Sequence, residues 1–136
     1  MPRAALTAAV LALVLSACGT ATSSQNSKFK GAQQDVVRVV DSLAQASSRG
    51  NAEKICNEML AKQLLTELKS AGGDCVTEMD RAIKDASDYD LQVTSVKISG
   101  SNASAQVRQG NSGKTATFTF VKEGGAWKAS ALGSGT

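Results

Sequence analysis

The amino-acid sequence predicts one α+β domain in which helices come first and an antiparallel sheet follows. Between residues 31 and 86, apolar side chains recur at spacings of three and four, which is the period of an amphipathic helix. Between residues 91 and 132, apolar and polar side chains alternate, which is the period of a strand with one buried face. Helices segregated from strands in this way are typical of α+β folds, and a region of about 100 residues supports a single hydrophobic core.

The first helix is expected between Gly31 and Ser48. Gly50 can adopt the left-handed conformation that closes many helices, and Asn51 can accept a backbone hydrogen bond as the N-cap of a new helix. The apolar stripe of this first helix consists of Val36, Val37, Val40, Leu43, Ala44 and Ser47.

Two further helical segments are expected before the sheet. The second runs from Ala52 to the glycines at 72 and 73, with a break near Asn57, and Asp74 is a good N-cap for the third. The apolar positions of the second segment are Ile55, Met59, Leu60, Leu64, Leu65 and Leu68. Those of the third are Val76, Met79, Ile83 and Ala86.

Four strands are expected, joined by short turns as an antiparallel meander. In the first strand the alternation slips by one residue between Val93 and Val96, which predicts a β-bulge that bends the strand. In the third strand, threonines alternate with alanine and phenylalanine, a strong strand signal. The strands cover residues 91–98, 103–107, 115–122 and 126–132.

The N-terminal residues predict export and lipid attachment. Arg3 precedes an apolar run at residues 4–17, which has the length of a signal peptide and is too short to span a bilayer as a helix. The four residues from Leu15 to Cys18 resemble the lipobox of bacterial lipoproteins, in which cleavage makes the cysteine the first mature residue. An ordinary secretory signal and an uncleaved anchor are the less favoured alternatives.

This interpretation divides the chain into four parts. Residues 1–17 are the signal peptide, residues 18–29 are the lipidated Cys18 with a small, polar tether, residues 30–133 are the folded domain, and residues 134–136 are a tail. Two or three acyl chains on Cys18 make a stable anchor. The expected location is therefore the cell membrane, with the domain on its extracytoplasmic side.

The three cysteines fit this division. Once Cys18 carries lipid, Cys56 and Cys75 remain as a pair, and an exported protein lies in a compartment where a disulfide persists. The alternative is a metal or redox site. The chain has no histidine and no Cys-x-x-Cys spacing, so we expect a disulfide and no metal.

The order of elements resembles a known family. A helix followed by Gly50 to Lys54, a short cysteine-containing helix and a third helix opening on a second cysteine precede a bent sheet. Its last hairpin, from Phe120 to Lys128, is similar to a recurrent turn of the small nuclear transport factor 2-like (cystatin-like) lipoproteins of bacteria, apart from the extra glycine of the pair 124–125. The resemblance covers residues 30–132. It implies helices wrapped against a curved four-stranded sheet, forming a cone that often holds a pocket.

Candidate site residues follow from this resemblance. Phe118, Phe120 and Trp127 are candidate pocket-lining residues, although core packing is the default role for Phe118 and Trp127. Enzymatic members use Asp, His or Tyr as acid and base in the cone. Histidine is absent here, and Asp35, Asp41 and Tyr89 are better read as helix-flank and turn residues, so no catalytic residue is predicted.

The charge and the motifs of the chain argue against two further classes of function. The formal net charge is only +3, with basic residues scattered along the chain, which argues against nucleic-acid binding. No motif for a cofactor is present, and none is expected. The sequence therefore predicts a non-catalytic envelope module that binds a small apolar ligand or a partner protein. The alternative is a cone-pocket enzyme of the isomerase or cyclase type.

Overall fold

The computed structural model describes residues 28–86, 88–110 and 112–133, and it has the predicted α+β order. The helical elements are α1 (Ala32–Ser48), α2 (Ala52–Lys54), the π-helical turn η2 (Ile55–Met59), α3 (Lys62–Ser70) and α4 (Cys75–Asp85). The strands are β1 (Leu91–Ser99), β2 (Asn102–Gln109), β3 (Thr115–Glu123) and β4 (Ala126–Ala131). Among the described residues, no helix has both the length and the hydropathy required to cross a membrane.

The sheet is the predicted antiparallel meander, in the order β1-β2-β3-β4. Its register shifts in β1 between Val93 and Ser95, which confirms the bulge that the sequence indicates. A second shift lies opposite Ser130, between Thr119 and Phe120. The regular alternation of β3 gave no sign of this second irregularity. Bulges bend strands, so both outer pairs of the sheet contribute to its curvature.

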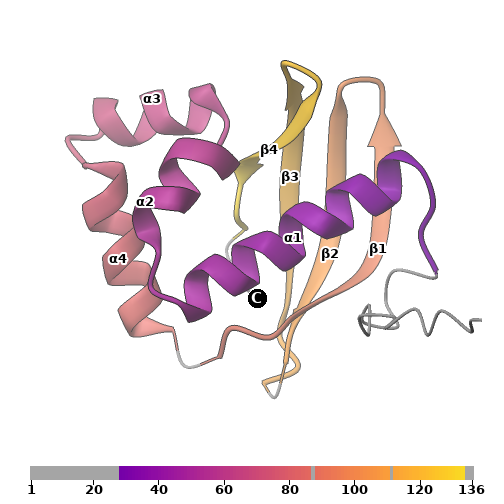
Figure 1. The fold of residues 1–136 in the computed structure, drawn as a ribbon, viewed down its shortest axis with the longest axis horizontal. Helices are drawn as coiled ribbons and strands as arrows, with labels where there is room; N and C mark the ends of the chain where they lie inside the picture. The colour runs from indigo at the N-terminus through magenta and orange to yellow at the C-terminus, as the bar shows by residue number, and fades with distance from the viewer. Residues whose placement is uncertain (1–27, 87, 111, 134–136) are drawn as a thin grey trace, which may run out of the picture.

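Helix α1 lies across one face of the sheet, and α2, α3 and α4 gather beside the β4 edge (Figure 1). The buried side of α1 consists of Val36, Val37, Val40, Leu43 and Ala46. Ala46 thus takes the place predicted for Ala44 and Ser47, which are only half-buried. The sheet contributes alternate apolar side chains of all four strands to the same core, while the intervening residues are more exposed.

The second helical segment is interrupted later than predicted. The expected break near Asn57 is instead an extended kink at Leu60 and Ala61, between η2 and α3. Leu60 forms an isolated parallel bridge with Ala129 of β4, and the Ala61 N–H donates to the Ala129 carbonyl oxygen at 2.8 Å. The kink therefore attaches the helical layer to the edge of the sheet.

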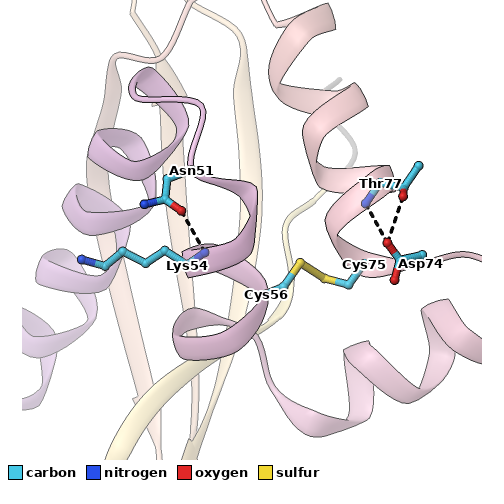
Figure 2. Close-up of a disulfide and its surroundings, with 6 residues drawn as sticks. All are labelled: Asn51, Lys54, Cys56, Asp74, Cys75 and Thr77. Carbon is cyan, nitrogen blue, oxygen red and sulfur yellow. Dashed lines mark hydrogen bonds between the residues drawn. A yellow bond between two sulfur atoms is a disulfide. The ribbon is translucent and has the colours of Figure 1, made fainter.

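Both predicted N-caps are confirmed (Figure 2). The Asn51 side chain accepts from the Lys54 N–H at 3.1 Å, directly after Gly50 takes up the left-handed conformation at φ 67°. The Asp74 carboxylate accepts from the Thr77 N–H at 3.0 Å and from the Thr77 hydroxyl at 2.9 Å. These bonds satisfy N–H groups that have no partner inside their own helices.

A disulfide joins Cys56 of η2 to Cys75 at the start of α4 (Figure 2). The predicted pairing is present, with a Cα–Cα distance of 6.0 Å. The bridge encloses all of α3, which buries no residue fully. A covalent link therefore holds in place a region that has little core of its own.

The N-terminal boundary of the folded part differs from the expected one. Phe29, which we assigned to the tether, is buried and belongs to the core cluster. The neighbouring Lys28 donates from Nζ to the Thr94 carbonyl oxygen at 3.2 Å. The predicted lipid-attachment residue Cys18, the signal peptide at 1–17 and the tail at 134–136 lie outside the described residues.

Candidate functional site

Two adjoining apolar pockets lie beneath α4. The first, of about 140 Å³, is lined by residues of α1, η2, α4, the segment before β1, and β3. The second, of about 220 Å³, lies between α3 and α4. Met79, Ala82 and Leu132 line both pockets, so the two form one apolar hollow, which we call the α4 hollow.

The hollow exists because α4 covers the core incompletely. Of the residues of α4, only Ile83 is fully buried, although the helix has a continuous apolar stripe. Val76, the first residue of that stripe, is 39% exposed but lines neither pocket, whereas Met79 lines both and is half-buried. On the facing side, Leu64 and Leu68 of α3 line the second pocket without being fully buried. Apolar surface is thus turned toward unfilled space, which favours the entry of an apolar molecule.

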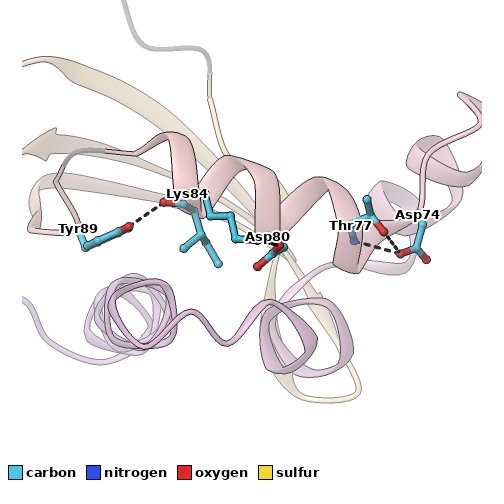
Figure 3. A network of polar contacts seen from close by, with 6 residues as sticks. Asp74, Thr77, Asp80, Lys84 and Tyr89 are labelled. Carbon is cyan, nitrogen blue, oxygen red and sulfur yellow. Dashed lines mark hydrogen bonds and ion pairs between the residues drawn. The ribbon is translucent and has the colours of Figure 1, made fainter.

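Polar groups are confined to a few positions of the hollow. Ser47, Asp88, Tyr89 and Gln109 line the first pocket, and Glu78 lines the second. The Tyr89 hydroxyl donates to the Ile83 carbonyl oxygen at 2.7 Å, a bond drawn as the dashed line from Tyr89 to α4 in Figure 3, where Ile83 carries no label. Asp88 accepts from the Asp90 N–H at 2.9 Å and packs tightly against Gly110. A few fixed polar groups in an apolar pocket are the usual means of orienting a ligand.

The three predicted pocket-lining residues do not share one pocket. Phe118 lines the α4 hollow, Trp127 lines a separate polar pocket beside α1, and Phe120 lines a third pocket, of about 620 Å³, at the β2–β3 pairing. All three are buried, at 7%, 6% and 1% exposure for Phe118, Trp127 and Phe120. The three aromatic side chains therefore belong to the buried core, and they do not line one common pocket.

The residues that we weighed as acid or base are not brought together. Asp35 pairs with Arg38 at 3.3 Å on the exposed side of α1. Partial burial raises the pKa of Asp41, but neither aspartate lines any of the pockets described here. The Tyr89 hydroxyl is engaged with the end of α4. Across residues 28–86, 88–110 and 112–133, no three His, Cys, Asp or Glu side chains are grouped to hold a metal ion.

Sequence reasoning missed most residues of the hollow. Met79 was identified as part of an apolar stripe, but Ala82 and Leu132 carried no signal. The hollow depends on how α4 packs against η2 and α3, beside Leu132, and this cannot be read from local periodicity. One feature of the sequence could have indicated an unfilled apolar space here. The helices α3 and α4 carry apolar stripes with leucine and methionine, but both helices are too short to bury these stripes against each other.

Comparisons of the chain with protein families, with curated proteins and with solved structures give no match.

Proposed function

We propose that this chain is a bacterial lipoprotein, anchored to the extracytoplasmic face of the cell membrane through Cys18, whose domain binds a small apolar ligand and does not catalyse a reaction. The lipobox-like residues 15–18 and the short apolar run before them support the anchor. The helix-then-sheet order and the hairpin ending at Lys128 support a nuclear transport factor 2-like domain.

The α4 hollow is the observation that carries the binding proposal. Its two adjoining pockets, of about 140 and 220 Å³, together fall at the lower end of the range of about 300–1,000 Å³ that is usual for ligand sites. A ligand there would contact Phe118 at one end and Leu68 at the other. Removing apolar surface from water yields about 25 cal/mol per Å², so a short acyl or prenyl chain would bind without charged partners.

The position of α4 suits an entry route. The disulfide fixes the first turn of α4 to η2, and the Tyr89 hydroxyl holds its last turn. Between these two attachments, Met79 and Ala82 face the hollow while contributing little to the core.

An enzyme of the isomerase or cyclase type would require converging polar groups, and Asp35, Asp41 and Tyr89 supply no such arrangement. The hollow also favours a small ligand over a partner protein, because its apolar surface is concave.

Filling the hollow tests the proposal. Ala82 is exposed at the surface and lines both pockets, so Ala82→Phe occupies the hollow without replacing a core residue. The full chain in a neutral detergent is titrated with the uncharged fluorophore N-phenyl-1-naphthylamine, and medium-chain fatty alcohols are added as competitors. We expect saturable binding that Ala82→Phe abolishes and that the matched control Ala71→Phe, which lines none of these pockets, retains. Equal binding by both variants, or no saturable binding by the natural chain, would contradict the proposal.

A further inference from the structure

The polar pocket that Trp127 lines has a volume of about 350 Å³ and is rich in basic side chains. It lies on the side of α1 opposite to the α4 hollow. It is formed by α1, the α2–η2 segment and the first residues of β4. It shares no lining residue with the α4 hollow. Its cationic residues are Arg38, Arg49, Lys54 and Lys128. We call it the basic pocket.

The positive charge of this pocket is only partly balanced. Glu58 is its single acidic lining residue among those the structure describes. Arg38 is paired with Asp35, and the Lys128 ammonium donates to the Glu58 carbonyl oxygen, not to its carboxylate. Within the described ranges, the side chains of Arg49 and Lys54 form no ion pair.

The two unpaired cations are placed together by the turn between α1 and α2. Arg49 is the C-cap of α1, Gly50 reverses the chain, and Asn51 caps α2 so that Lys54 follows one turn later. The Lys54 side chain extends away from the disulfide toward α1 (Figure 2). Caps at both ends of this turn fix the backbone that carries both cations, and a preorganised guanidinium and ammonium are suited to an oxyanion.

An unpaired hydrogen-bond donor lies in the same wall. Trp127 lines the basic pocket, is 6% exposed, and its indole Nε1–H has no acceptor. Buried donors without an acceptor are rare in folded proteins. The Lys122 ammonium lies 5.6 Å from the centre of the Trp127 ring, which adds a further cation close to this wall. The pocket thus combines an excess of cations with the ring of a tryptophan whose buried N–H has no acceptor, and its remaining walls include Val39 and Met59.

We propose that the basic pocket is a second binding site, which takes a small molecule bearing a phosphate-type oxyanion with two or more negative charges. Arg49 and Lys54 bind the oxyanion, and Trp127 and Met59 contact the body of the ligand. The pocket volume is within the usual range for small-molecule sites. The same chemistry is presented by a free phosphorylated compound and by the phosphate monoester headgroup of a lipid. This site is independent of the apolar ligand proposed for the α4 hollow.

Trp127 provides a direct reporter because it is the single tryptophan of the chain. The full chain in neutral detergent is titrated with inorganic pyrophosphate at constant ionic strength, and the indole ¹H–¹⁵N resonance is followed by NMR. Dioctanoyl phosphatidic acid replaces pyrophosphate in a second arm. A saturable shift with pyrophosphate would show that the pocket binds a free phosphorylated compound. A saturable shift with phosphatidic acid alone would show that it binds a lipid headgroup. Either result supports the proposal, and no shift in both arms overturns it.

Two double variants that remove the same charge distinguish binding at the basic pocket from nonspecific electrostatic attraction to the protein. Arg49→Gln with Lys54→Gln removes the two unpaired cations and should weaken binding by about tenfold or more, because charge-assisted bonds to the oxyanion are lost. Lys69→Gln with Lys114→Gln removes the same charge from residues that do not line the basic pocket and should leave binding within about twofold, since exposed charges at a distance are screened by salt. Equal weakening by both double variants would reveal nonspecific electrostatics and overturn the proposal.

Discussion

The Tyr89 hydroxyl donates a 2.7 Å hydrogen bond to the carbonyl oxygen of Ile83, six residues earlier in the chain. The same carbonyl oxygen also accepts from the Ala86 N–H at 3.2 Å, so the tyrosine adds a second hydrogen bond at the C-terminal turn of α4. Ile83 is also the one fully buried residue of that helix. The single tyrosine of the chain therefore holds the helix that covers the α4 hollow.

Tyr89→Phe removes this bond and keeps the ring. We expect a loss of about 0.5–1.5 kcal/mol in the free energy of unfolding, measured by urea denaturation, because one intramolecular hydrogen bond is lost. Amide hydrogen exchange should accelerate in the last turn of α4 and stay unchanged in β2 and β3. Unaltered exchange at Asp85 and Ala86 would show that the hydroxyl does not hold this turn.

The disulfide should contribute more than any single hydrogen bond. Cys56 and Cys75 are separated by 19 residues, for which the chain-entropy model gives about 3 kcal/mol. Cys56→Ser with Cys75→Ser should lower the free energy of unfolding by about that amount and loosen α3 and α4 first, because α3 has no fully buried residue. Mass spectrometry without reductant should show a bond between the two cysteines in the natural chain. Alkylation of both thiols without reductant would contradict the bond.

Asp41 provides a test of pH dependence. Partial burial raises its pKa above the ordinary value of 3.8, so the folded state favours the neutral acid. The resulting contribution to stability is present at low pH and is lost as the pH rises from about 3.8 through the raised value. Asp41→Asn, which removes the charge, should raise the melting temperature at pH 7 and leave it nearly unchanged at pH 3. Asp35→Asn on the exposed side of α1 is the control, and a lower melting temperature for Asp41→Asn at pH 7 would show that the carboxylate makes a needed contact.

The sequence predicted the elements well where local chemistry decides them. Asn51 and Asp74 were identified as caps from residue type, and the bulge near Val93 from a slip in alternation; both depend on neighbours in the chain. The kink at Leu60 and Ala61 escaped prediction because both residues continue an apolar helical pattern. What ends the helix is pairing with Ala129, about 70 residues later. Tertiary contacts override local propensity in such places.

The pockets were harder to predict for the same reason. Phe118, Phe120 and Trp127 were predicted as possible pocket-lining residues, with core packing as the default role of Phe118 and Trp127, and all three are buried. The basic pocket combines Arg38, Arg49 and Lys54 with Lys128, which lies far along the chain. A scattered set of cations gives no sequence signal, and only the pairing of the β3–β4 hairpin with the helical layer brings Lys128 to η2.

The buried Phe29 sets the N-terminal limit of the folded part. Phe29→Ala should lower the free energy of unfolding by about 3 kcal/mol, because removal of a buried aromatic ring leaves a cavity in the core. The adjacent Lys30 is exposed, so Lys30→Ala should change stability by less than about 0.5 kcal/mol. Chains beginning at residue 28 should keep the full stability, and those beginning at residue 30 should show the same loss as Phe29→Ala. Equal stability of the two truncated chains would show that Phe29 belongs to the tether and not to the folded domain.

The last prediction concerns Cys18, which the proposed function makes the point of attachment to the membrane. Cleavage before Cys18 would leave a thiol and an amino group for acylation, and a single acyl chain binds only marginally, whereas two or three anchor stably. Cys18→Ala should therefore abolish incorporation of radiolabelled palmitate and leave the precursor uncleaved or the protein in the soluble fraction. Cys56→Ser with Cys75→Ser is the matched control, because it removes two cysteines and should keep the label. A natural chain that partitions with membranes without incorporating palmitate would contradict lipidation at Cys18 and favour an uncleaved anchor.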